Sequence, residues 1–292
     1  MSVRLVIWTE PPVRSHLTNI FLGLACLVMG GLTGCATFHR SADLAACATP
    51  QPQIERGKPH ACLDGVGWVI GIPGKVLLWN CRVDNHHISE KTEAEIEQYL
   101  ACTGLPDTKV RLNQYDPRGE WQRLRSNDQI APGWRYTAGV WHWLGYTILP
   151  GRVFGGDWYN PYTNTVNVYS DVPSIAIEET AYAVDVAGRK HPGTYAFVQG
   201  LPLVNMWHHT IATDRAIAYE QTTGDAEGLK EAYQVLYPRY GLLAGQGTGY
   251  FLGATALFEV GGALAGHAAG RYEGSRISLP EPESTVTAIF AD

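Results

Sequence analysis

The sequence predicts an α+β domain followed by a glycine-rich, hydrophobic helical element. Two short segments, 109–115 and 165–169, alternate apolar and polar residues as half-buried strands do. Longer segments place apolar residues at helical spacing between a capping residue and a glycine. Towards the carboxyl end, glycine recurs at every fourth residue through a segment with almost no charge. These patterns predict strands and helices, but they do not identify the architecture.

The first capped helix is predicted over residues 89–103. Ser89 is a suitable N-cap residue, Ile96 and Leu100 follow at helical spacing, and Gly104 can end the helix. The alternating segment 109–115 then predicts a strand.

Three further helices are predicted after the second strand, 165–169. Ser170 and Asp171 are cap-type residues before Pro173, and Gly188 can close the helix that follows. A second helix is predicted from Pro202 to about residue 222, and a third from 226 to 236 because Pro238 would end it.

Two aromatic, apolar segments precede these helices. Residues 65–79 contain a tryptophan near each end and one lysine, so they fit either a bilayer interface or the core. Burial in the core is the simpler expectation. Residues 134–154 fit either a buried aromatic wall or a segment that dips into a membrane, and the sequence leaves both open.

The amino terminus has the pattern of a signal peptide. An uncharged run, 20–32, follows Arg4 and Arg14, and Leu-Thr-Gly-Cys ends at Cys35. Residues 32–35 resemble a bacterial lipobox. This resemblance implies removal of residues 1–34 and lipid on Cys35, and therefore an exported protein anchored in the cell envelope, in either the inner or the outer membrane. An uncleaved signal anchor is the alternative.

Composition limits the partners of the mature chain. Removing residues 1–34 takes two arginines and one glutamate from totals of 22 basic and 28 acidic residues, so the balance stays acidic. An acidic chain is a poor partner for nucleic acid. Four cysteines remain besides Cys35 in a compartment that permits disulfides, and the sequence does not decide among their three pairings: Cys47, Cys62, Cys81 and Cys102.

The segment 160–187 (NPYTNTVNVYSDVPSIAIEETAYAVDVA) carries a resemblance to a known fold. It resembles the edge strand and active-site helix of gluzincins, the zinc metallopeptidases with an HExxH helix. Residues 66–225 as a whole look like a family of bacterial membrane-associated proteins with that arrangement. The resemblance implies a zincin-like domain, with a small mixed sheet, an edge strand and active-site helices.

The resemblance also implies a degenerate metal motif. The first zinc-binding histidine falls on Glu178, the general base on Glu179, and the second histidine on Tyr182. The glutamate ligand of the next helix falls on His209. Only Glu179 keeps its family residue type, and a tyrosine must lose a proton with a pKa of about 10 before it binds metal well.

These changes favour a pseudo-peptidase that binds another protein, with no cofactor. One alternative is a hydrolase with zinc or another divalent metal, held by Glu178 and His209 with nearby His208 or Asp185, and with Glu179 as base. Glutamates and histidines on two packed helices also commonly form a plain ion pair, which favours the first hypothesis.

The glycine-rich element suggests close helix packing. Its glycines fall on one helical face in two series: Gly241, Gly245, Gly249 and Gly253, then Gly262, Gly266 and Gly270. Small residues at this spacing let helices approach closely, in a membrane or in self-association. A hairpin packed on the preceding domain is the alternative. A third functional hypothesis follows, in which these helices act and the domain is a spacer.

The predicted organisation has five parts. They are a signal peptide (1–34), a tether (35–64), a metallopeptidase-like domain (65–240), glycine-zipper helices (241–271) and an irregular tail (272–292).

Overall fold

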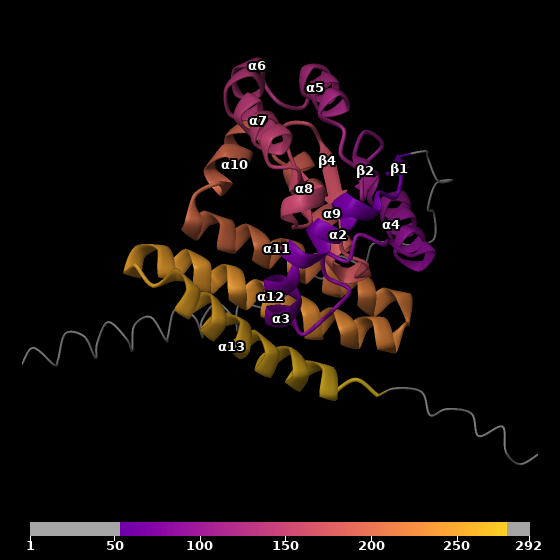
Figure 1. The fold of residues 1–292 in the computed structure, drawn as a ribbon, viewed down its shortest axis with the longest axis vertical. Helices are drawn as coiled ribbons and strands as arrows, with labels where there is room; N and C mark the ends of the chain where they lie inside the picture. The colour runs from indigo at the N-terminus through magenta and orange to yellow at the C-terminus, as the bar shows by residue number, and fades with distance from the viewer. Residues whose placement is uncertain (1–52, 279–292) are drawn as a thin grey trace, which may run out of the picture. The chain divides into compact units, whose positions relative to one another are not determined.

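The computed structural model describes residues 53–278 as a mixed α+β structure that is mostly helical, with one small sheet (Figure 1). The predicted signal peptide, the lipidation site Cys35, most of the tether and the last 14 residues lie outside the described residues.

Four short strands form a mixed sheet in the order β1-β2-β4-β3. The strands are β1 (Ile54–Arg56), β2 (Lys109–Leu112), β3 (Trp158–Asn160) and β4 (Thr165–Val168). β1, β2 and β4 are parallel, with Val110 opposite Val166, and β3 pairs antiparallel with β4 at the edge. The first predicted strand ends before residue 115, because Asn113 adopts a left-handed conformation with φ of 47°.

Helices cover the sheet and extend beyond it. They are α2 (Ala61–Ile70), α3 (Ile72–Leu78), α4 (Glu90–Thr103), α5 (Pro117–Ser126), α6 (Pro132–Trp134), the π-helical turn η2 (Arg135–Gly139), α7 (Val140–Ile148), α8 (Gly151–Phe154), α9 (Pro173–Ala187), α10 (Pro192–Gln199), α11 (Pro202–Thr223), α12 (Ala226–Leu252) and α13 (Thr255–Ser275).

Helix α9 joins two hydrophobic cores. On one side, Ala176 and Ala183 pack with α4 against the valines of β2 and β4. On the other side, Ile175 and Ile177 pack with α11 and α12. Both sides of α9 are therefore buried, and any polar residue on it must find a partner inside the protein.

The caps confirm the predicted helix 89–103. The Ser89 side chain accepts a hydrogen bond from the backbone N–H of Thr92, and Gly104 ends the helix with a φ of 65°. Ser170 and Asp171, in contrast, do not cap α9, which begins after Val172. Their side chains are used elsewhere, because Asp171 accepts hydrogen bonds from Ser89, and Ser170 accepts one from the backbone of Asp84.

The prediction that Pro238 ends a helix is wrong, because α12 continues through it to Leu252. α13 runs back along α12, as Figure 1 shows, and the two backbones are very close at Pro238. A Cβ atom added to Gly266 would lie only 2.5 Å from the Pro238 Cα. Packing against α13 therefore outweighs a proline cost of about 3 kcal/mol.

The glycine series lie at this contact between α12 and α13. A Cβ on Gly241 would lie 2.1 Å from the Gly262 carbonyl oxygen, and one on Gly270 would lie 2.2 Å from the Tyr233 oxygen. Gly253 ends α12 with a φ of 68°, which makes the turn. The face that the sequence offers for self-association is thus occupied within the hairpin.

The expectation that residues 65–79 are buried in the core is wrong. They form α2 and α3, whose outer sides expose Val66, Val69, Val76 and Trp79. In the described part of the chain no single helix is long and apolar enough to cross a membrane; α2 and α3 reach that length and composition only together, across a bend of 49°.

The cysteines are now partly assigned. Cys102 is disulfide-bonded, whereas Cys62 and Cys81 are exposed free thiols and do not pair with each other.

Candidate functional site

The candidate site lies where α9, α11 and α12 meet behind the edge strand β3. The packing of α9 between two cores places Glu178 and Glu179 in the interior, where they are only 1% and 3% exposed. Two adjacent carboxylates in such a position need a cation, because an unpaired buried charge is very costly.

That cation is Arg239 of α12. Its guanidinium forms an ion pair with Glu178 through one terminal nitrogen and with Glu179, at 2.6 Å, through the other. The second nitrogen also donates a hydrogen bond to the Asp157 carbonyl oxygen, at 3.2 Å. The planar fork of an arginine suits this bridging geometry.

Each carboxylate has one further hydrogen-bond donor. The Thr213 hydroxyl on α11 donates to Glu178 at 2.7 Å, and the Tyr159 backbone N–H on β3 donates to Glu179 at 2.9 Å. His209 lies nearby, with its Nδ1 atom 3.8 Å from a Glu178 oxygen, and that nitrogen has no hydrogen-bond partner among the described residues. The site therefore holds Glu178, Glu179 and His209 together around an arginine.

The pKa values of the two glutamates are shifted in opposite directions. Burial alone would raise the pKa of Glu178, but the charge of Arg239 and the contacts of His209 and Thr213 lower this pKa to about 2. For Glu179, burial and the neighbouring charge of Glu178 outweigh Arg239, so its pKa is raised. The pair shares one cation, and Glu178 is the more firmly ionised partner.

Tyr182 belongs to a different network. Its hydroxyl donates a hydrogen bond to the Gln199 side chain, away from Glu178. Gln199 also contacts His208, whose Nδ1 atom lies 3.2 Å from Asp185. Burial raises the pKa of Tyr182 well above its usual range, so the hydroxyl stays protonated.

The network around Asp185 is also buried and structural. Burial would raise the pKa of Asp185, but hydrogen bonds from His208 and Tyr195 and the charge of Arg189 lower it. Burial lowers the pKa of His208. Asp185 is only 4% exposed and links α9 to α10 and α11 through Tyr195 and His208, so it is a buried structural partner.

These residues do not fit the zinc site that the gluzincin resemblance implies. Both Glu178 oxygens already have partners, and the Tyr182 hydroxyl is engaged elsewhere. Across residues 53–278, no three His, Cys, Asp or Glu side chains are arranged to hold a metal ion. The donor set suits the arginine and not a divalent metal.

Arg239 is not among the site residues predicted from the sequence. Charge balance was the available signal, because two adjacent glutamates in an apolar helix need a counter-charge. On α12, which packs against α9, only Lys230 and Arg239 could supply that counter-charge.

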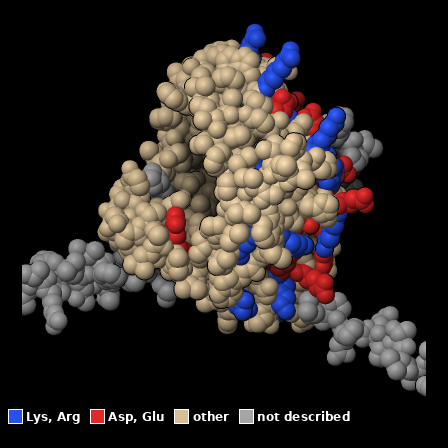
Figure 2. Space-filling model, viewed as in Figure 1, with Lys and Arg blue, Asp and Glu red and all other residues tan. Residues whose placement is uncertain are grey.

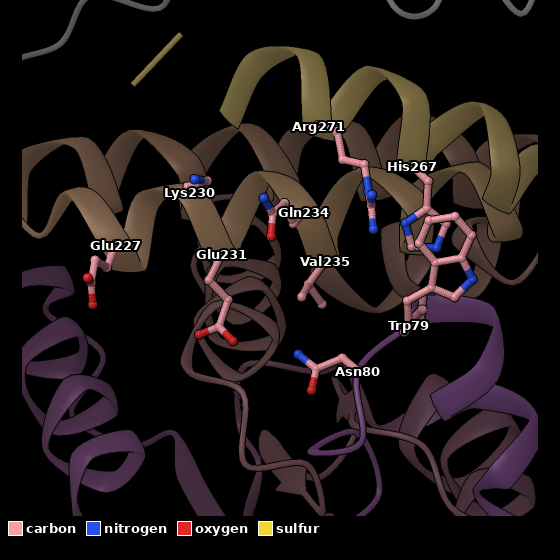
Figure 3. A pocket seen from close by; sticks show the side chains of 10 residues that line it. Trp79, Asn80, Glu227, Lys230, Glu231, Gln234, Val235, His267 and Arg271 are labelled. Carbon is pink, nitrogen blue, oxygen red and sulfur yellow. The ribbon is translucent and has the colours of Figure 1, made fainter. Parts of the chain in front are cut away.

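A separate cavity of about 300 Å³ lies between the end of α3 and helices α12 and α13. Figure 3 shows Trp79 stacked against His267, with Asn80, Glu231 and Arg271 around the opening. Glu231 is paired with Arg82, and Arg271 lies over the Trp79 ring. None of the site residues predicted from the sequence lines this cavity.

Comparison of the chain with family models, curated proteins and solved structures finds no significant match.

Proposed function

We propose that this chain is a non-catalytic envelope lipoprotein, anchored through Cys35, whose zincin-like domain is a pseudo-peptidase that acts by binding another protein. The arrangement of edge strand β3–β4, helix α9 and helix α11 supports the zincin-like assignment, because a strand pair leads into the helix that bears the degenerate motif.

The observation that carries the proposal is the position of Arg239. In a zinc peptidase, the metal lies between the ligands of two helices and is the positive charge that activates water. Here the guanidinium is the positive charge, and it is bound to the residue at the first expected ligand position and to the residue at the expected base position, both on α9. A guanidinium does not lower the pKa of a water molecule as a bound metal does, so Glu179 lacks the activated water that a zinc peptidase supplies.

The same geometry disfavours the alternative of a rearranged hydrolase. Glu178 and His209 do lie close together, as that alternative requires. However, the Glu178 oxygens bind Arg239 and Thr213, and a metal would have to displace an arginine that is bonded to both glutamates.

A concave surface of the molecule suits a protein partner. Figure 2 shows a hollow, nearly free of charged groups, between the part that carries α7 and α10 and the α12–α13 hairpin. Helices at its border expose Phe197, Leu201, Trp207 and Tyr250. Exposed aromatic residues around a concave surface favour protein binding.

Metal content tests the proposal. Protein purified without chelator and offered zinc is analysed by inductively coupled plasma mass spectrometry, beside Glu178→Gln and His209→Gln. We expect no stoichiometric metal in any of the three proteins and no cleavage of casein. About one metal per chain in the wild type, lost in both variants, would favour the hydrolase.

A further inference from the structure

Helices α2 and α3 turn their charged residues inward. Asp64 and Lys75 are the only charged residues from 61 to 79. Asp64 pairs with Arg152, with oxygen–nitrogen distances of 2.7 and 3.0 Å. Lys75 is only 8% exposed, and its ammonium donates to the backbone oxygens of Trp68 and Asp84. On the protein side, Asp64 is thus ion-paired and the Lys75 ammonium is hydrogen-bonded to backbone oxygens.

The outer side of the same helices is apolar. Val69, Val76 and Trp79 are between 55% and 62% exposed. α8 packs beside α2 and exposes Phe154, and the end of α7 exposes Ile148. Single exposed apolar residues are ordinary, but several on helices that pack together, as α2 does with α3 and α8, mark an interaction site.

We infer that this apolar wedge, formed by α2, α3, α8 and the end of α7, lies in the headgroup and upper acyl region of a lipid bilayer. Interfacial helices have an apolar side that inserts to a shallow depth and tryptophans near the headgroups, and the exposed Trp68 fits that pattern. The bend of 49° between α2 and α3 suits a shallow insertion.

The distribution of charge agrees with this orientation. Figure 2 shows that Lys, Arg, Asp and Glu gather on the side of the molecule where Figure 1 places α4 and β1, whereas the part that carries α2 and α8 is almost uncharged. In α2 and α3 the backbone N–H and C=O groups bond within the helices, and the charged side chains point inward. The wedge therefore exposes an apolar surface without charged side chains of its own, which a lipid bilayer accepts without directional contacts.

The predicted anchor would hold the wedge near lipid. Gln53, the first described residue, lies 18 residues after Cys35. A chain of that length reaches at most about 60 Å when fully extended. A lipid on Cys35 would thus keep the domain beside the bilayer, and the wedge determines which side faces it.

Photo-crosslinking tests the inference. The full chain is made with benzoylphenylalanine in place of Val69, of Ile148 or, as control, of the exposed Gln98 on α4, and is reconstituted with vesicles of phosphatidylcholine. After irradiation, mass spectrometry measures the lipid adducts on each labelled peptide. We expect adducts at residues 69 and 148 in roughly tenfold excess over residue 98.

Two results would overturn the inference. One is equal labelling at the three positions, or none, whether or not the chain floats with the vesicles. The other is crosslinking of residue 69 to protein, either the same chain or a second copy. The inference does not rest on the pseudo-peptidase proposal, because a metal-binding, active enzyme could use the same wedge.

Discussion

Replacing Arg239 by methionine should destabilise the protein strongly. Methionine keeps much of the side-chain volume but leaves Glu178 and Glu179 buried without a cation. Removing one partner of a buried ion pair typically costs about 3–5 kcal/mol. The pKa of Glu178, lowered from 4.5 to about 2 mainly by Arg239 against the effect of burial, indicates that the ionised carboxylate stabilises the fold.

The pH dependence makes this prediction specific. In the wild type, the lowered pKa of Glu178 means that its ionised carboxylate stabilises the fold at a pH above 4.5, the pKa in the unfolded chain. This stabilisation is lost as the pH falls towards about 2. In Arg239→Met, burial without the cation raises the pKa of Glu178, so that this glutamate instead stabilises the fold as the pH falls. The difference between wild type and variant should therefore be largest above pH 5 and shrink below pH 4.

Urea unfolding at pH 7 and pH 3.5 measures both effects. Glu178→Gln/Arg239→Met is the matched control, and it should recover part of the loss at pH 7, because one of the two unpaired charges is gone. A loss below about 1 kcal/mol at pH 7, or a loss that does not depend on pH, would refute the reasoning.

Three further predictions concern other parts of the molecule. Burial and neighbouring carboxylates raise the pKa of Glu220 to about 7. The protonated side chain therefore stabilises the fold below pH 4.5, and this contribution is lost as the pH rises through 7. Urea unfolding of Glu220→Gln should show a free energy of unfolding about 2 kcal/mol higher than that of the wild type at pH 8 and equal to it at pH 4. Gly262→Ala should lower the free energy of unfolding by about 1–3 kcal/mol, because the added Cβ would lie 2.0 Å from a backbone oxygen of α12. In the control Gly261→Ala the added Cβ meets nothing within 4 Å, so this variant should be neutral or stabilising. Equal thermal denaturation midpoints for the two variants would contradict the hairpin packing. Cys62 and Cys81 should both react with a maleimide in the folded protein, and protection of either thiol would contradict its exposure.

The sequence predicted best what depends on local chemistry. The ends of α4 follow from Ser89 and Gly104, and the end of α11 follows from Gly224, because capping residues act within a few positions of the chain. The start of α9 was not predictable in this way. Its cap-type neighbours bond to residues more than 80 positions away, such as Ser89 and Asp84.

The candidate site shows the same division. Spacing placed Glu178 and Glu179 on one helix and His209 on the next, and the structure brings them together. Arg239 comes from a third helix, 60 residues after Glu179, so no local pattern connects it to the site. Tyr182 shares the helix but points to Gln199, because side-chain direction depends on neighbours that the sequence does not specify.

The exposure of α2 and α3 could not be decided from periodicity. An apolar segment reads the same whether it packs against protein or lipid. Asp64 and Lys75 face the protein because they bond to Arg152 and to the Asp84 backbone, and these partners are set by the three-dimensional fold.

If the charge of Arg239 replaces that of a metal, the folded protein should not bind zinc, and unfolding with and without zinc measures this. A ligand that binds the folded state at 100 times its dissociation constant stabilises it by about 2.7 kcal/mol. We predict that excess zinc leaves the unfolding free energy of the wild-type chain unchanged at pH 7. A saturable increase of that size in the wild type, abolished in both Glu178→Gln and His209→Gln, would contradict the claim.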